Sequence, residues 1–163
     1  MSLAPRVESD GQLARLLQIG VALEEVVEVR AHRHYQTLPA AERDAEIEAL
    51  LDEAAAESAE HRRTLEALVD DLEASAVPVE EIEALVGEQY ASTRPEDFDG
   101  VLYDQLNGEE TAYKFYDDLI EAIEEGEAAF SVDREHLLDT LRDIREAEAE
   151  GVEAVAEMME DRA

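Results

Sequence analysis

One pattern occurs twice in the chain: residues 28–38, Glu28-Val-Arg-Ala-His-Arg-His-Tyr-Gln-Thr-Leu38, return as Glu109-Glu-Thr-Ala-Tyr-Lys-Phe-Tyr-Asp-Asp-Leu119. Glutamate, alanine, tyrosine and leucine recur at matched places in the two stretches. Steps of three, four and seven residues return to one face of a helix, so each copy sets a carboxylate into an otherwise apolar helical stripe. The repeat therefore predicts two similar helical units with a site shared between them.

The composition of the chain favours one all-α domain. The chain has 163 residues, which predicts a single domain spanning 1–163 with a substantial core. Hydrophobic residues make up 45% and aromatic residues only 5%, a mixture typical of helices. There is no cysteine, which excludes disulfides, iron-sulfur clusters and other cysteine-ligated metals. No apolar run reaches membrane-spanning length, so we expect a cytoplasmic protein that does not bind membranes.

The charge of the chain is extreme. Forty-four acidic residues against 13 basic ones give a net charge of −31, and Lys114 is the only lysine. Such a surface is typical of proteins from organisms with molar intracellular salt, where screening over about 3 Å removes the self-repulsion. The acid excess predicts a halophilic protein, and the lack of a basic patch argues against binding to nucleic acid.

Apolar residues at helical spacing predict four long helices, at about 10–38, 41–74, 97–126 and 131–159, and a short one at about 78–90. Pro39, Pro78 and Pro95 separate them. Short loops indicate two antiparallel hairpins, about 10–74 and 97–163. The connection 75–96 leaves room for a crossover that carries the short helix. The predicted fold is a four-helix bundle with one crossover connection.

Polar residues interrupt the apolar stripes of the second and fourth long helices. Ser58 and His61 are three residues apart on one, and Glu148 and Gly151 are three apart on the other. A two-metal site in a bundle core uses one Glu from each of two helices and Glu-x-x-His from each of the others. Carboxylates bridge cations and imidazole completes a coordination sphere, so these positions are candidate metal ligands.

Together these motifs resemble the ferritin-like superfamily, in particular its rubrerythrin-like branch. Gly108-Glu109-x-x-Ala112-x-x-x-Tyr116 is similar to the ligand helix of that family, and Glu28-x-x-Ala31-x-x-x-Tyr35 is its second copy. The resemblance covers nearly the whole chain and implies four metal ligands: Glu28, His61, Glu109 and Glu148.

The chain also departs from the family pattern. Ser58 stands where the family has a bridging glutamate, and Gly151 stands where it has a second histidine. The four remaining ligands could hold one ion, or two ions with several waters. Glu57, Glu24 and His32 lie one turn from the expected ligands and are candidate substitutes. Tyr35 and Tyr116 are expected to hydrogen-bond to the carboxylates.

The resemblance implies a non-haem iron protein, mononuclear or di-iron, that reacts with dioxygen or peroxide, with manganese or zinc as alternative metals. The absence of cysteine excludes the rubredoxin-type domain of a full rubrerythrin, so a redox reaction would require an external electron donor. The alternative is a ferritin-like scaffold with a degenerate, metal-free site that acts through protein–protein contacts, for example as a homodimer. A nucleic-acid-mimicking decoy is a third hypothesis, which needs acids in spaced rows.

Overall fold

The computed structural model describes residues 6–72 and 98–162, and this part of the chain is helical with no strand. Its four long helices are α1 (Asp10–Gln36), α2 (Ala45–Asp71), α4 (Phe98–Glu125) and α5 (Arg134–Asp161). A single 3-10 turn, η1 (Ala40–Glu42), lies between α1 and α2. The prediction of an all-α four-helix bundle is confirmed. The short helix expected at about 78–90 lies outside the described residues.

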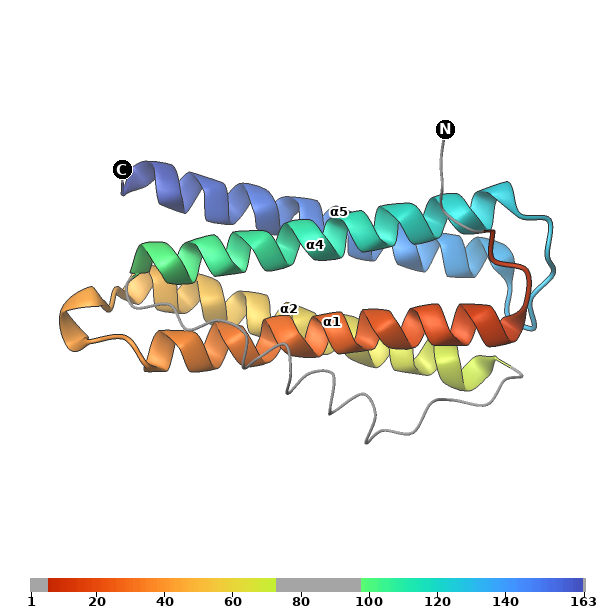
Figure 1. Cartoon of the computed structure of the whole chain (residues 1–163), viewed down its shortest axis with the longest axis horizontal. Helices are drawn as coiled ribbons and strands as arrows, with labels where there is room; N and C mark the ends of the chain where they lie inside the picture. The colour runs from red at the N-terminus through yellow and green to blue at the C-terminus, as the bar shows by residue number, and fades with distance from the viewer. Residues whose placement is uncertain (1–5, 73–97, 163) are drawn as a thin grey trace.

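The helices form two antiparallel hairpins that lie side by side (Figure 1). α1 packs against α2 and α4 against α5, and the hairpins meet mainly through α1 and α4. α2 ends and α4 begins at opposite ends of the bundle (Figure 1).

Helix boundaries follow the capping chemistry of the chain. Asp44 accepts a hydrogen bond from the Glu46 amide at the start of α2, and Asp133 accepts one from the His136 amide at the start of α5. α2 begins at Ala45 rather than near Ala41 as predicted, because Tyr35 fixes the preceding turn. The Tyr35 hydroxyl donates to the Asp44 carbonyl (3.0 Å) and accepts from the Asp44 amide (2.9 Å).

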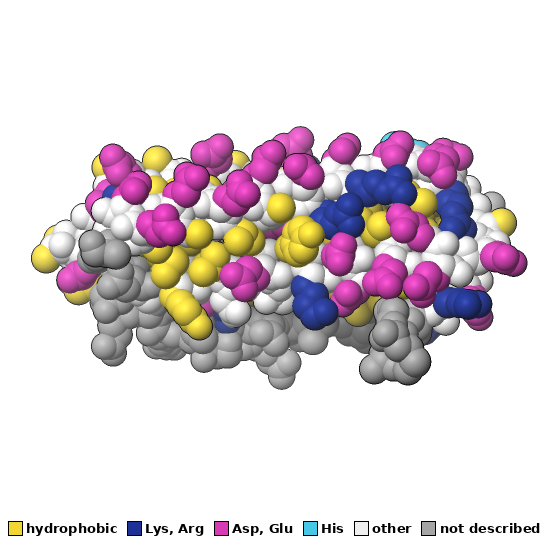
Figure 2. All heavy atoms as spheres, turned by 90° about the horizontal axis from the view of Figure 1, so that it is seen from above, with side chains coloured by type: hydrophobic (Ala, Val, Ile, Leu, Met, Phe, Trp, Pro, Cys, Tyr) yellow, Lys and Arg dark blue, Asp and Glu magenta, His cyan; other side chains and the backbone are white. Residues whose placement is uncertain are grey.

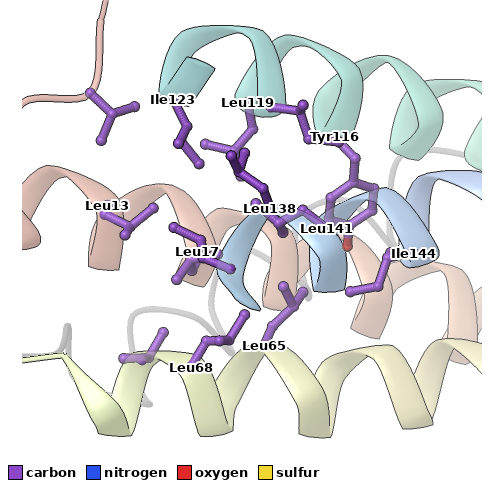
Figure 3. Close-up of a cluster of buried hydrophobic side chains, with 14 of the residues drawn as sticks. Leu13, Leu17, Leu65, Leu68, Tyr116, Leu119, Ile123, Leu138, Leu141 and Ile144 are labelled. Atoms are coloured by element: carbon purple, nitrogen blue, oxygen red, sulfur yellow. The ribbon is translucent and has the colours of Figure 1, made fainter. Parts of the chain in front are cut away.

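Two separate groups of buried apolar side chains fill the bundle. The first apolar cluster lies toward the start of α1 and is shown in Figure 3. It includes Leu13, Leu17, Leu65, Leu68, Tyr116, Leu119, Ile123, Leu138, Leu141 and Ile144. The second apolar cluster lies toward the end of α1 and includes Ala31, Tyr35, Leu38, Ile47, Leu51, Ala55, Val101, Leu102 and Val155. Both clusters draw on all four helices, so apolar burial holds the bundle together at two levels.

The excess of acidic residues lies on the surface of the bundle. Figure 2 shows Asp and Glu side chains along the whole length of one face, with fewer basic side chains among them. None of the described helices combines the length and hydropathy that crossing a bilayer requires.

Candidate metal centre

A layer of polar side chains separates the two apolar clusters. Each long helix supplies one member: Glu24 from α1, His61 from α2, Glu109 from α4 and Glu148 from α5. On every helix this residue falls in sequence between the residues of the first and second apolar clusters. We call these four residues the polar layer. The apolar levels on both sides exclude water from it along the bundle axis.

Three members of the polar layer converge on one point. A ligand atom from each of Glu24, His61 and Glu148 lies within 4.8 Å of the other two. Nδ1 of His61 is 3.4 Å from Oε1 of Glu24 and 3.3 Å from Oε1 of Glu148. Two ligands of one metal ion, each about 2.1 Å from it, lie about 3 to 4 Å apart. The spacing therefore fits a single ion held by all three side chains.

The layer is buried, and its polar atoms are incompletely satisfied. Glu24 is 0% exposed, Glu148 3% and Glu109 6%. Oε2 of Glu24 and Nδ1 of His61 are buried without a hydrogen-bond partner among the described residues. Buried polar atoms are nearly always hydrogen-bonded, so such orphans indicate a missing partner. A cation bound to both atoms would satisfy them.

Burial and mutual repulsion shift the pKa values of these groups in different directions. Burial, followed by contact with the Glu109 carboxylate and the charge of Glu24, raises the pKa of Glu148 far above its usual range. Burial disfavours the charged form of Glu24, but contacts with His61 and Glu148 outweigh it and lower the pKa of Glu24. Burial likewise opposes the charged imidazole, yet Glu24 raises the pKa of His61. Without metal, the layer thus favours an ionised Glu24, a protonated Glu148 and a charged His61.

Two neighbours on α4 orient the carboxylates. The Tyr116 hydroxyl donates a 2.7 Å hydrogen bond to Oε1 of Glu24, and burial with this nearby charge raises the pKa of Tyr116 well above its usual value. The Gln105 amide donates to Oε1 of Glu109 at 2.9 Å. Hydrogen bonds of this kind fix a ligand's rotamer before the metal arrives.

Gly151 makes room for the fourth carboxylate. A Cβ atom at this position would lie 2.7 Å from Oε2 of Glu109, closer than real Cβ contacts allow. The resemblance implies that Gly151 replaces a histidine ligand. In the structure, the Glu109 carboxylate packs against Gly151. Ser58, the other departure from the family pattern, is buried on α2.

Glu28, the predicted ligand of α1, lies apart from the converging group. Its Oε2 is 3.3 Å from Nη1 of Arg62, and its side chain is 25% exposed. Glu24, one turn earlier and named as a substitute, occupies the polar layer instead. The sequence pattern does not indicate this ion pair, although Arg62 directly follows His61.

The other candidates lie at the edge of the layer or away from it. Oε1 of Glu57 is 3.8 Å from Nε2 of His61, and burial raises the pKa of Glu57 despite the opposing charge of His61. Tyr35 holds the turn before α2 and not a carboxylate. The side chain of His32 lies outside the described part of the structure.

Comparison with known proteins adds no relative. No protein-family model matches this chain, and neither does any curated protein or solved structure. The site must therefore be interpreted from its own chemistry.

Proposed function

We propose that this chain is a ferritin-like metal-binding protein that holds one ion between Glu24, His61 and Glu148, with Glu109 as a further ligand. The observation that carries the proposal is the convergence of the three ligand atoms within 4.8 Å between the two apolar clusters. The orphaned atoms of Glu24 and His61 support it, because a cation would satisfy both.

The topology supports the ferritin-like part of the proposal. α2 ends and α4 begins at opposite ends of the bundle, so these two helices run in the same direction (Figure 1). Antiparallel hairpins joined by one long crossover are the arrangement of ferritin-like bundles.

The ligand set favours iron, manganese or zinc. One imidazole with two or three carboxylates is a donor set of nitrogen and hard oxygen, which suits these ions better than copper(I) or calcium.

One bound ion is favoured over two, because Glu28 is paired with Arg62 and Gly151 has no side chain that could bind a second ion. If the metal is iron, it supplies reactivity toward dioxygen or peroxide, and an external donor supplies the electrons.

The residues of this chain would prepare the site in defined ways. Tyr116 holds the Glu24 carboxylate, and Gln105 holds Glu109. Glu148 would lose the proton that burial favours on it without metal and would become a ligand. The two apolar clusters keep bulk water from the ion along the bundle axis.

The test is a matched pair of substitutions on α1. Purified protein, prepared without chelators, is titrated anaerobically with Fe²⁺ and separately with Zn²⁺ in molar salt. Glu24→Gln should reduce affinity at least about 100-fold, because it removes a charged ligand. Glu28→Gln, one turn away, should leave affinity within about threefold. Wild-type protein that binds neither ion would refute the proposal.

A second candidate function is a metal-free scaffold that acts through protein–protein contacts, for instance as a homodimer. It is favoured by the ion pair of Glu28 with Arg62 and by the raised pKa of Glu148, both of which lower the negative charge of the site without a metal. This function predicts that Glu24→Gln changes the free energy of unfolding by the same amount with and without added metal. Metal-dependent stabilisation of the wild type would exclude it.

A further inference from the structure

An open groove runs between α2 and α5 and has a volume of about 550 Å³. These two helices pack against each other less closely than α1 against α2, α4 against α5 or α1 against α4. The groove is lined by apolar residues such as Leu50 and Met158 and by six glutamates. These are Glu46, Glu53, Glu57, Glu109, Glu150 and Glu157. None of its described lining residues is basic.

The groove reaches the polar layer at two points. Glu57, which lines it, lies 3.8 Å from Nε2 of His61. Glu109, a member of the layer, also lines it beside Gly151. A side chain at position 151 would cover the Glu109 carboxylate, so the glycine leaves that carboxylate open to the groove.

In the described part of the chain, the other approaches to the layer are packed more closely than this groove. The first and second apolar clusters block the bundle axis on both sides of it. α1 packs tightly against α2, and α4 against α5. The fully buried Oε2 of Glu24 has no hydrogen-bond partner among the described residues, so an ion that arrives from the groove meets an unsatisfied carboxylate at its inner end.

We propose that the α2–α5 groove is the route by which a divalent cation reaches and leaves the polar layer, with Glu57 as the carboxylate that first receives the cation beside His61. This inference rests on the proposed function. A cleft lined by one sign of charge raises the local concentration of the opposite ion and its rate of association. Glu57 is suited to a transfer role because it is partly exposed in the groove and also contacts a ligand.

The test separates the rate of binding from its equilibrium. Co²⁺ is the probe, mixed with the full chain in a stopped-flow instrument and followed by quenching of tyrosine fluorescence, to which Tyr116 contributes from beside the site. Its dissociation constant is measured independently by calorimetry. Ala154→Phe, at an exposed position of the groove on α5, obstructs the route. Ala67→Phe, exposed on α2 and outside the groove lining, is the matched control.

We expect Ala154→Phe to slow association and dissociation together by about tenfold, since an obstruction changes the barrier and not the bound state. Ala67→Phe should leave both rates unchanged. The association rate of Glu57→Gln should be about three- to tenfold lower than that of Glu66→Gln. Glu66→Gln is the charge-matched control, because Glu66 is exposed on α2 outside the groove lining.

Each outcome is decisive. Wild-type protein that does not bind Co²⁺ at equilibrium would refute the proposed function, and the inference with it. Normal equilibrium binding with unchanged rates in both Ala154→Phe and Glu57→Gln would refute the route alone. If Ala154→Phe does not fold, as judged by its helical circular dichroism, the Glu57→Gln and Glu66→Gln pair decides.

Discussion

The Tyr116 hydroxyl of α4 donates a 2.7 Å hydrogen bond to Oε1 of Glu24 on α1, and this contact joins the two hairpins at the polar layer. Tyr116 also belongs to the first apolar cluster, so one side chain links the packing of the core to the orientation of a candidate ligand. The packing that fixes the tyrosine ring therefore also fixes the carboxylate.

Tyr116→Phe removes this hydrogen bond and keeps the ring. We expect a loss of about 1 to 2 kcal/mol in the free energy of unfolding, because the buried Glu24 carboxylate loses a donor. We also expect metal affinity to fall by about tenfold or more, because the carboxylate is no longer oriented. Urea denaturation and Zn²⁺ titration measure the two effects. Tyr35→Phe is the control, because Tyr35 holds the turn before α2, and it should reduce stability without changing affinity.

Gly151→Ala tests whether the glycine serves the site. In a solvent-exposed helix interior this change gains about 1 kcal/mol from helix propensity. Here the new Cβ would lie 2.7 Å from Oε2 of Glu109, so the carboxylate must move. We expect weaker Zn²⁺ binding by at least about tenfold and no gain in stability. Gly11→Ala, where a Cβ would meet only Ser9 at 3.9 Å, should be neutral or stabilising. Equal behaviour of the two variants would contradict the assigned role.

The sequence predicted the fold more completely than the ligands. The helical period and the proline breaks are local signals, and they located the four long helices. Glu24 and Glu28, in contrast, lie one turn apart on the same stripe, so periodicity could not choose between them. Contacts from other helices separate the two, because Arg62 pairs with Glu28 and Tyr116 binds Glu24. Such pairings depend on how helices are packed and rotated, which one sequence does not specify.

Gly151 illustrates a second limit of sequence analysis. The family resemblance implies that this position has lost a metal-binding histidine. Its role in the structure depends on the conformation of Glu109, a residue on another helix. A missing side chain gives no signal in a sequence about which neighbour fills its space.

Salt should stabilise this protein markedly. With a net charge of −31, the folded chain repels itself in dilute buffer, and molar salt screens that repulsion to within about 3 Å. We expect the melting temperature to rise by roughly ten degrees or more between 0.1 M and 2 M KCl. Thermal melts followed by circular dichroism measure this. NaCl is the control for a potassium-specific effect. A melting temperature independent of both salts would contradict the halophilic interpretation.

Metal binding should release protons, and its affinity should rise with pH. Burial raises the pKa of Glu148 far above 4.5, so this carboxyl is protonated at neutral pH without metal and must lose its proton to become a ligand. The folded metal-free state thus binds a proton that the unfolded chain loses above about pH 4.5. The stability of that state should therefore fall as the pH rises through the neutral range. Zn²⁺ should counter this loss of stability.

Calorimetry in buffers of different ionisation enthalpy measures the number of protons released, which we expect to be about one or more per bound ion. Glu148→Gln should bind Zn²⁺ more weakly, with a smaller release and a flatter stability profile. A metal affinity that does not change between pH 6 and 8 would show that Glu148 is not a ligand.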